Sequence, residues 1–397
     1  MVTAIRGGFK FLLKWIVMNI LLTDYIYPIT SPLIISKYYK FELDNPREND
    51  EIELIKVKIK EHHQKSDDLR FPPRADKRYI SLASMLRDIA KYYSKDDYFN
   101  EIFNKNFNAK SYDKIYSFLA KIWIIARYND QGENERLNKI QKKMKKKGKK
   151  GFFILDDENP IEKNASKLVD FSHLISLLVN TDDEFYNGRC FIYDRLDLLG
   201  YDNPRFIQCL LYLCVGCHLK NKKDNTDWLI FPKIKDKLIE VSSNIDYFLT
   251  NNTDDKLSYI SNLLRIASKG VSDNKLKIVL LTSLIEFILT RNPNSNRFNV
   301  EDSISKQFQL KTSIIIYQNN KSQNIDEIKN NLKIIYKTRS CIAHGNIDDL
   351  NAILKKEKKQ GNEYFLDNLV HILYQYLKAI INEYLKDPKF IEYLKMS

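Results

Sequence analysis

Near its carboxyl end the chain reads Leu332-Lys-Ile-Ile-Tyr336-Lys-Thr-Arg339-Ser340-Cys341-Ile342-Ala343-His344-Gly345. Leu332, Ile335 and Ile342 follow the spacing of one helical face, and a glycine just past the last turn commonly ends a helix. Arg339 stays charged throughout the physiological pH range, whereas His344 can gain or lose a proton near neutrality. Cleaving a phosphodiester without a metal needs one group that moves protons and another that neutralises charge on the phosphate. This segment therefore predicts a helix that ends at a candidate catalytic pair.

Helical patterning surrounds this segment from Lys256 to the end of the chain. One expected helix has an apolar face formed by Leu257, Ile260, Leu263, Leu264 and Ala267. Residues 275–290 are almost wholly apolar around Glu286, which indicates a central helix, and further helices are expected over 326–343 and 364–385. We therefore predict a helical bundle over residues 256–397, a length that readily forms one core.

The first 255 residues are expected to be mixed. Partial alternation between residues 34 and 59 predicts strands in a segment 1–75. Residues 76–255 are expected to form a helical regulatory or sensor region, with a short strand from Phe152 and helices at 80–93, 112–128, 168–179, 205–219 and 234–249. A polar break at 251–255 suits helix capping and marks the last domain boundary. The predicted fold is mainly α, with a mixed α/β and helical amino-terminal region before the bundle.

Composition and charge narrow the class of protein. Of 397 residues, 44% are hydrophobic and only 11 are Gly and 10 Pro, which favours a globular protein with long helices. The formal charge of +13 is compatible with a polyanionic partner and equally with a lysine-rich solvated surface. The basic run 139–150 is expected to be an exposed loop, with contact to RNA or DNA as the less favoured alternative.

Cysteines and histidines outside the carboxyl-terminal motif do not predict a cofactor. Five cysteines, an odd number spread over a long chain, suit a reducing cytoplasm. Cys214, Cys217 and His218 match a C-x-x-C-H pattern, and Cys209 lies just upstream. They fit core thiols better than a metal site or haem attachment, because neither a second Cys or His pair at the spacing of a structural zinc site nor an export signal is evident. His173 and His371 fall in amphipathic helices and are expected to be ordinary core or boundary histidines. We therefore predict neither a metal nor a cofactor.

The amino terminus contains an apolar run, Phe11–Leu22, preceded by basic residues. Lys14 interrupts the run, no small-residue cleavage site follows, and its length is short for a bilayer span. A buried helix or strand is therefore favoured over a membrane anchor, and the predicted location is cytoplasmic.

The geometry of Arg339 and His344 leaves several arrangements open. Five positions along an ideal helix rotate the side-chain direction by about 140°, so a straight helix would not aim both at one point. Gly345 could end the helix and turn His344 towards the cleft of Arg339. A second copy of the chain could instead complete the site across a two-fold axis. Alternatively, both side chains could simply cap the negative end of the helix dipole.

The residues that flank the pair resemble a known family. Leu281-Thr-Ser-Leu-Ile-Glu286-Phe-Ile-Leu places an acid in an apolar helix, upstream of the pattern Tyr336-x-x-Arg339-Ser340-x-φ-x-His344-Gly345. Together they resemble the HEPN superfamily, and most closely its Apea-like branch. The resemblance covers about the last 140 residues. Many nuclease members carry Asn, Asp or His directly after the Arg, whereas Ser340, found here, is common in the Apea-like branch.

The resemblance implies a helical bundle that dimerises and forms a composite, metal-independent ribonuclease centre, often in antiviral defence or toxin–antitoxin systems. It implies that Arg339 binds the scissile phosphate, that His344 is a general acid or base, and that Glu286 orients the site, with Tyr336, Ser340 and Gly345 as supporting motif residues. The implied partners are an RNA substrate, a second copy of the chain, and a protein or phage-derived trigger. The alternative is an inactive HEPN module that binds RNA or a partner protein.

Overall fold

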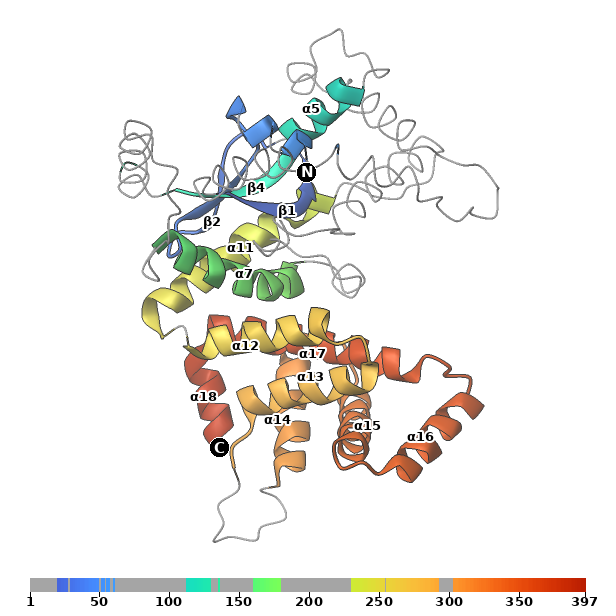
Figure 1. Ribbon diagram of the computed structural model, residues 1–397. Helices are drawn as coiled ribbons and strands as arrows, with labels where there is room; N and C mark the ends of the chain where they lie inside the picture. The colour runs from blue at the N-terminus through green and yellow to red at the C-terminus, as the bar shows by residue number, and fades with distance from the viewer. Residues whose placement is uncertain are drawn as a thin grey trace, which may run out of the picture. The chain divides into compact units, whose positions relative to one another are not determined.

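The computed structural model describes the residues 20–27, 29–49, 51–53, 55–57, 60, 112–129, 135, 160–179, 230–253, 255–292 and 303–397 (Figure 1). The chain divides into two compact units. The first contains residues Met1–Val169 and Cys190–Ser242, and the second contains Asp170–Arg189 and Ser243–Ser397. The fold is mainly α with a mixed α/β amino-terminal region, as the sequence predicts.

The described strands of the first unit form one antiparallel sheet in the order β1-β4-β3-β2. The strands are β1 (Ile20–Ile26), β2 (Leu33–Ser36), β3 (Phe41–Asp44) and β4 (Trp123–Tyr128), and the helix α5 (Tyr112–Ile122) leads directly into β4. Two further helices, α7 (Pro160–Val179) and α11 (Ile230–Asn251), confirm the helices expected at 168–179 and 234–249. Both pass from the first unit into the second.

The predicted helix over 112–128 is wrong in its last 6 residues. The chain is helical to Ile122 and then continues as β4, which pairs with β1 on one side and β3 on the other. Every side chain of β4 except Arg127 is buried, because the strand occupies the middle of the sheet. A continuous apolar run carries no period that distinguishes a buried strand from a buried helix.

The strands predicted between residues 34 and 59 are confirmed only for β2 and β3. Residues 51–53 and 55–57 are helical instead. The Glu51 carboxylate accepts the backbone N–H groups of Arg47 (3.0 Å) and Glu48 (3.2 Å), which satisfies donors that a helix start leaves unpaired. Glu51 and Ile55 are both buried, at the i,i+4 spacing of one helical face. The alternation in the sequence was therefore a misleading signal.

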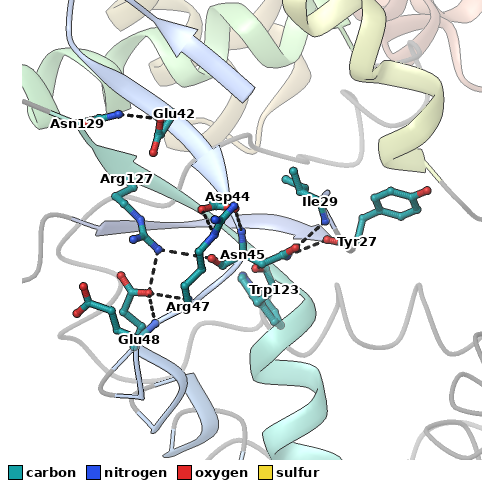
Figure 2. A network of polar contacts seen from close by, with 11 residues as sticks. Tyr27, Ile29, Glu42, Asp44, Asn45, Arg47, Glu48, Trp123, Arg127 and Asn129 are labelled. Carbon is teal, nitrogen blue, oxygen red and sulfur yellow. Dashed lines mark hydrogen bonds and ion pairs between the residues drawn. The ribbon is translucent and has the colours of Figure 1, made fainter. Parts of the chain in front are cut away.

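Buried Asn45 ties the end of β3 to two neighbouring segments (Figure 2). Its Oδ1 accepts the backbone N–H of Ile29 at 2.6 Å, and its Nδ2 donates to the carbonyl oxygens of Tyr27 and Trp123 at 2.9 and 3.0 Å. Beside it, Arg127 of β4 donates from Nη2 to Glu51 Oε2 at 2.9 Å. These contacts use buried polar groups to fix the sheet against the following helix, so we assign them a structural role.

The second unit contains the helical bundle predicted for residues 256–397. Its elements are α12 (Asp255–Arg265), the π-helix η1 (Ile266–Gly270), α13 (Asn274–Leu289), α14 (Ile304–Asn319), α15 (Ile325–Ala343), α16 (Ile347–Lys359), α17 (Phe365–Lys386) and α18 (Pro388–Met396). As predicted, α13 is central: it packs against α12, α14, α15, α17 and α18. Figure 1 shows α16 projecting from the bundle, and Leu350 is its one fully buried residue.

Several predictions concern residues outside the described part of the chain. They are the helices at 80–93 and 205–219, the strand from Phe152, the basic loop 139–150, and Cys209, Cys214, Cys217 and His218. Most of the apolar run Phe11–Leu22 also lies outside, although its last three residues open β1. Among the described helices, none combines the length and apolar character needed to cross a bilayer.

Candidate functional site

The helix α15 carries most of the motif, and both of its ends are defined by local chemistry. The Asn324 side chain accepts the backbone N–H of Asp326 at 2.9 Å, a typical N-cap. At the other end Gly345 adopts φ = 68°, a left-handed conformation that glycine tolerates without steric cost. The N–H groups of Asn346 and Gly345 donate to the carbonyls of Cys341 (2.9 Å) and Ile342 (3.3 Å), which completes a Schellman motif.

Arg339 is turned towards the interior of the bundle, where it pairs with Glu286 of α13. Arg339 Nη2 donates to Glu286 Oε2 at 3.1 Å, and the two side chains are 21% and 14% exposed. The guanidinium carbon lies 5.8 Å from the centre of the Tyr336 ring, one helical turn earlier on α15. The structure therefore brings together three of the predicted residues: Glu286, Tyr336 and Arg339.

Burial dominates the electrostatics of this cluster. It raises the pKa of Glu286 above its ordinary value, although the charge of Arg339 and the Tyr336 hydroxyl both act to lower it. Burial also raises the pKa of Tyr336, with the negative charge of Glu286 acting in the same direction. Glu286 Oε1 and Arg339 Nε are buried without a hydrogen-bond partner in the described part of the chain. The ion pair is therefore incompletely hydrogen-bonded.

His344 lies at the end of α15 and faces solvent. Its backbone N–H donates to the Ser340 carbonyl at 3.0 Å, and its φ and ψ of −97° and 3° depart from helical values, as expected of the C-cap residue. Its side chain is exposed and forms no hydrogen bond or ion pair with the described residues. Gly345 ends the helix as predicted, yet His344 is exposed whereas Arg339 is turned to Glu286, in keeping with the separation of about 140° that five positions of an ideal helix impose. Ser340, which follows Arg339 in the sequence, is half-buried.

Two surface features next to this site were not predicted. On α15, Lys329, Lys333 and Lys337 are exposed at a spacing of four residues, which we call the lysine ridge. On α14, which packs against α15, Leu310, Ile314 and Tyr317 are exposed at the i, i+4, i+7 spacing of one helical face; we call these the apolar stripe. Both spacings are visible in the sequence, but each becomes informative only when the buried faces of the two helices are known.

A second pair of polar side chains in the same unit has a structural explanation. His173 of α7 is buried, and its Nδ1 lies 3.3 Å from the Ser268 hydroxyl in the π-helix η1. The Ser268 hydroxyl also lies 3.2 Å from the Arg265 carbonyl, a second hydrogen-bond acceptor within reach of its proton. Because His173 is fully buried in the helical packing, the arrangement fits the core or boundary histidine expected from the sequence.

Comparisons with known proteins give no relative for this chain: no family model, no curated protein and no solved structure matches it. Within the described residues, no cluster of three or more His, Cys, Asp or Glu side chains could hold a metal ion. The chemistry of the site must therefore be argued from its own residues.

Proposed function

We propose that this protein is a metal-independent endoribonuclease whose active site combines Arg339 and His344 from two copies of the chain. One observation carries the proposal: Arg339, half-buried and paired with Glu286 of α13, and His344, exposed and without a partner among the described residues, lie at the same end of α15. A fixed cation and a solvent-exposed histidine that meet in one site are the minimum that transphosphorylation of RNA requires.

Each residue has a distinct role in the proposed reaction. Arg339 presents its remaining donors to the scissile phosphate and stabilises the charge that develops there. His344 takes the proton from the ribose 2′-hydroxyl or delivers one to the leaving oxygen. Because the 2′-hydroxyl is the nucleophile, the substrate is restricted to RNA. Glu286 positions the guanidinium from the buried side, and Tyr336 supports the same guanidinium with its ring. The reaction leaves a cyclic phosphate on one product.

Two copies are part of the proposal because one chain directs the two groups apart. A two-fold axis repeats each half-site, so that Arg339 of one chain can meet His344 of the other. The apolar stripe on α14 supports this arrangement, because it exposes three large apolar side chains on the helix next to α15. We assign the apolar stripe to contact with the second copy.

The proposed setting is prokaryotic antiviral defence or a toxin–antitoxin pair in the cytoplasm. An RNA-cleaving site has to be restrained until it is needed, and the residues before the bundle are the proposed sensor for a protein or phage-derived trigger. This part of the proposal is supported by the resemblance of the Tyr336–Gly345 segment to the Apea-like HEPN branch.

The second candidate function is an inactive module that binds RNA or a partner protein. It is favoured by the resting state of Arg339, because Glu286 already neutralises the charge that would meet a phosphate. It is also favoured by the absence of a described group that orients the His344 ring.

Cleavage of a labelled single-stranded RNA in EDTA separates the two candidates. We expect the wild type to cleave and to leave a cyclic phosphate, and Arg339→Ala and His344→Ala each to lose at least about a hundredfold in rate. Lys389→Ala, an exposed change on α18, is the control and should retain full activity. Cleavage that survives both substitutions would exclude the proposed site, and no cleavage by the triggered wild type would favour the inactive module.

A further inference from the structure

The lysine ridge lies on the face of α15 opposite to the core. At about 100° per residue, Lys329, Lys333 and Lys337 span about 80° of the helix surface. Four of the five buried residues of α15 (Ile328, Leu332, Ile335 and Thr338) are centred on the other side, and the fifth, Cys341, lies next to Lys337 around the helix. All three lysines are exposed, and none forms an ion pair or hydrogen bond with the described residues. A continuous, unneutralised strip of positive charge therefore runs along this helix.

The lysine ridge points along the helix to His344. His344 comes fifteen residues after Lys329. On an ideal helix its side chain is therefore rotated by about 60° from that of Lys329, between the directions of Lys333 and Lys337. Ser340, half-buried, falls within the same arc. The proposed proton-transfer group and the three cations therefore share one face of α15, whereas Arg339 lies on the face that contacts α13.

This charge pattern is unfavourable for the helix on its own. Like charges four residues apart repel one another on a helix surface and destabilise it. An anion with regularly spaced charges would convert that repulsion into attraction. Successive lysines are separated by about 6 Å along the axis, a step that an extended single strand can match with one phosphate each. On the described helices α15 and α16, acidic side chains lie in the first turns, beyond the two ends of the strip: Asp326 and Glu327 on α15, and Asp348 and Asp349 on α16.

We propose that the lysine ridge binds the phosphate backbone of single-stranded RNA and leads it to His344. The inference rests on the proposed function for the identity of the nucleic acid as RNA. It adds that the substrate lies along α15 and that it is single-stranded. Because the contacts are with phosphates, the lysine ridge fixes the position of the strand and carries no preference for base sequence. The salt dependence of binding reports directly on the number of phosphates it holds.

Binding is measured by fluorescence anisotropy with a labelled oligouridine RNA, in a His344→Ala background that prevents cleavage. The test variant replaces Lys329, Lys333 and Lys337 with Gln. The matched control replaces Lys355, Lys356 and Lys359 with Gln, exposed lysines of α16 that give the same change of charge. Circular dichroism spectra establish that both variants keep the helical content of the parent.

The test variant should bind at least about tenfold more weakly. The steepness of log K against log salt should fall by about 2, because each of the three lost phosphate contacts contributes about 0.7 on a single strand. The control should stay within about twofold of the parent. Equal losses in the two triple variants would overturn the proposal, since they would reflect net charge alone. Equal or tighter binding of a poly-glutamate probe of the same charge would overturn the assignment to nucleic acid.

The outcome is separable from the proposed function. With His344 intact, the test variant should raise KM for RNA cleavage and leave kcat nearly unchanged, because it removes binding and no proton-transfer group. If the wild type never cleaves RNA but the test variant still loses RNA binding, the ribonuclease proposal is rejected and the lysine-ridge proposal is kept. Normal cleavage and normal binding in that variant would reject the lysine ridge alone.

Discussion

Arg339 and Glu286 form an ion pair that joins α15 to the central helix α13, with Nη2 and Oε2 3.1 Å apart. The pair is half-buried and incompletely hydrogen-bonded, because Arg339 Nε and Glu286 Oε1 have no partner among the described residues. Burial outweighs the attraction of the guanidinium, so the pKa of Glu286 is raised. The same carboxylate that holds Arg339 in place is therefore easier to protonate than an ordinary glutamate.

This raised pKa makes a prediction for stability. The folded state binds a proton on Glu286 more readily than the unfolded state, so its contribution is complete below the ordinary glutamate pKa of 4.5 and is lost as pH rises through the folded value. Glu286→Gln removes this titration. The stability of the variant relative to the wild type should therefore increase with pH above 4.5, as measured by urea unfolding at a series of pH values. A wild type that gains on the variant as pH rises would contradict the raised pKa.

Gly345→Ala should destabilise the bundle through backbone strain alone. Gly345 has φ = 68°, and a Cβ placed there would meet no atom within 4 Å. The cost should be about 1 kcal/mol, because the left-handed conformation is unfavourable for alanine. Gly345→Asn is the matched control and should cost less, since asparagine tolerates this conformation. Equal urea midpoints for the wild type and the alanine variant would show that the turn is not held in this conformation.

In the first unit, Asn45→Ala should cost about 2 to 4 kcal/mol. The substitution leaves the Ile29 N–H and the Tyr27 and Trp123 carbonyls without the partner that Asn45 provides. Asn129→Ala removes an exposed hydrogen bond to Glu42 and should change stability by less than about 0.5 kcal/mol. Thermal or urea unfolding compares the two. Similar small effects would mean that Asn45 does not hold the sheet to its neighbouring segments.

The apolar stripe can be tested by a charge substitution. Leu310→Lys places a cation in the proposed contact with the second copy and should shift the protein from dimer to monomer in sedimentation experiments. Leu276→Lys on α13 is the control, because the two leucines are similarly exposed at 58% and 52%. A wild type that is monomeric, or a Leu310→Lys variant that remains dimeric, would reject the apolar stripe as the contact surface.

The helices of the bundle could be predicted because their apolar spacing is a local property. Most of the periodic residues around Leu257 and Leu332 are buried on one side of α12 and α15, whereas Leu263 and Ile342 at the edges of these faces are half-buried. The strand Trp123–Tyr128 could not be predicted in this way, since its apolar run fits a helix equally well and only its pairing with β1 and β3 decides. Similarly, the short segment after Glu51 alternates in sequence, yet helix capping by that side chain prevails.

The candidate site was only partly accessible from the sequence. The spacing of Arg339 and His344 already implied that one helix would direct them apart, and the structure has Arg339 turned to Glu286 and His344 exposed. The distance between Arg339 and Glu286, 53 residues apart, depends on how α13 and α15 pack, which no local pattern contains. The lysine ridge gained meaning only once the core face of α15 was known.

Mixing two inactive variants tests the two-chain site most directly. Arg339→Ala and His344→Ala are each expected to be inactive, but subunit exchange produces mixed dimers in which one site keeps an intact Arg339 and an intact His344. Random exchange of equal amounts should restore about one quarter of the wild-type cleavage rate, because half of the dimers are mixed and each has one complete site. An unchanged, inactive mixture of two folded, exchanging dimers would contradict a site that joins Arg339 of one chain to His344 of the other.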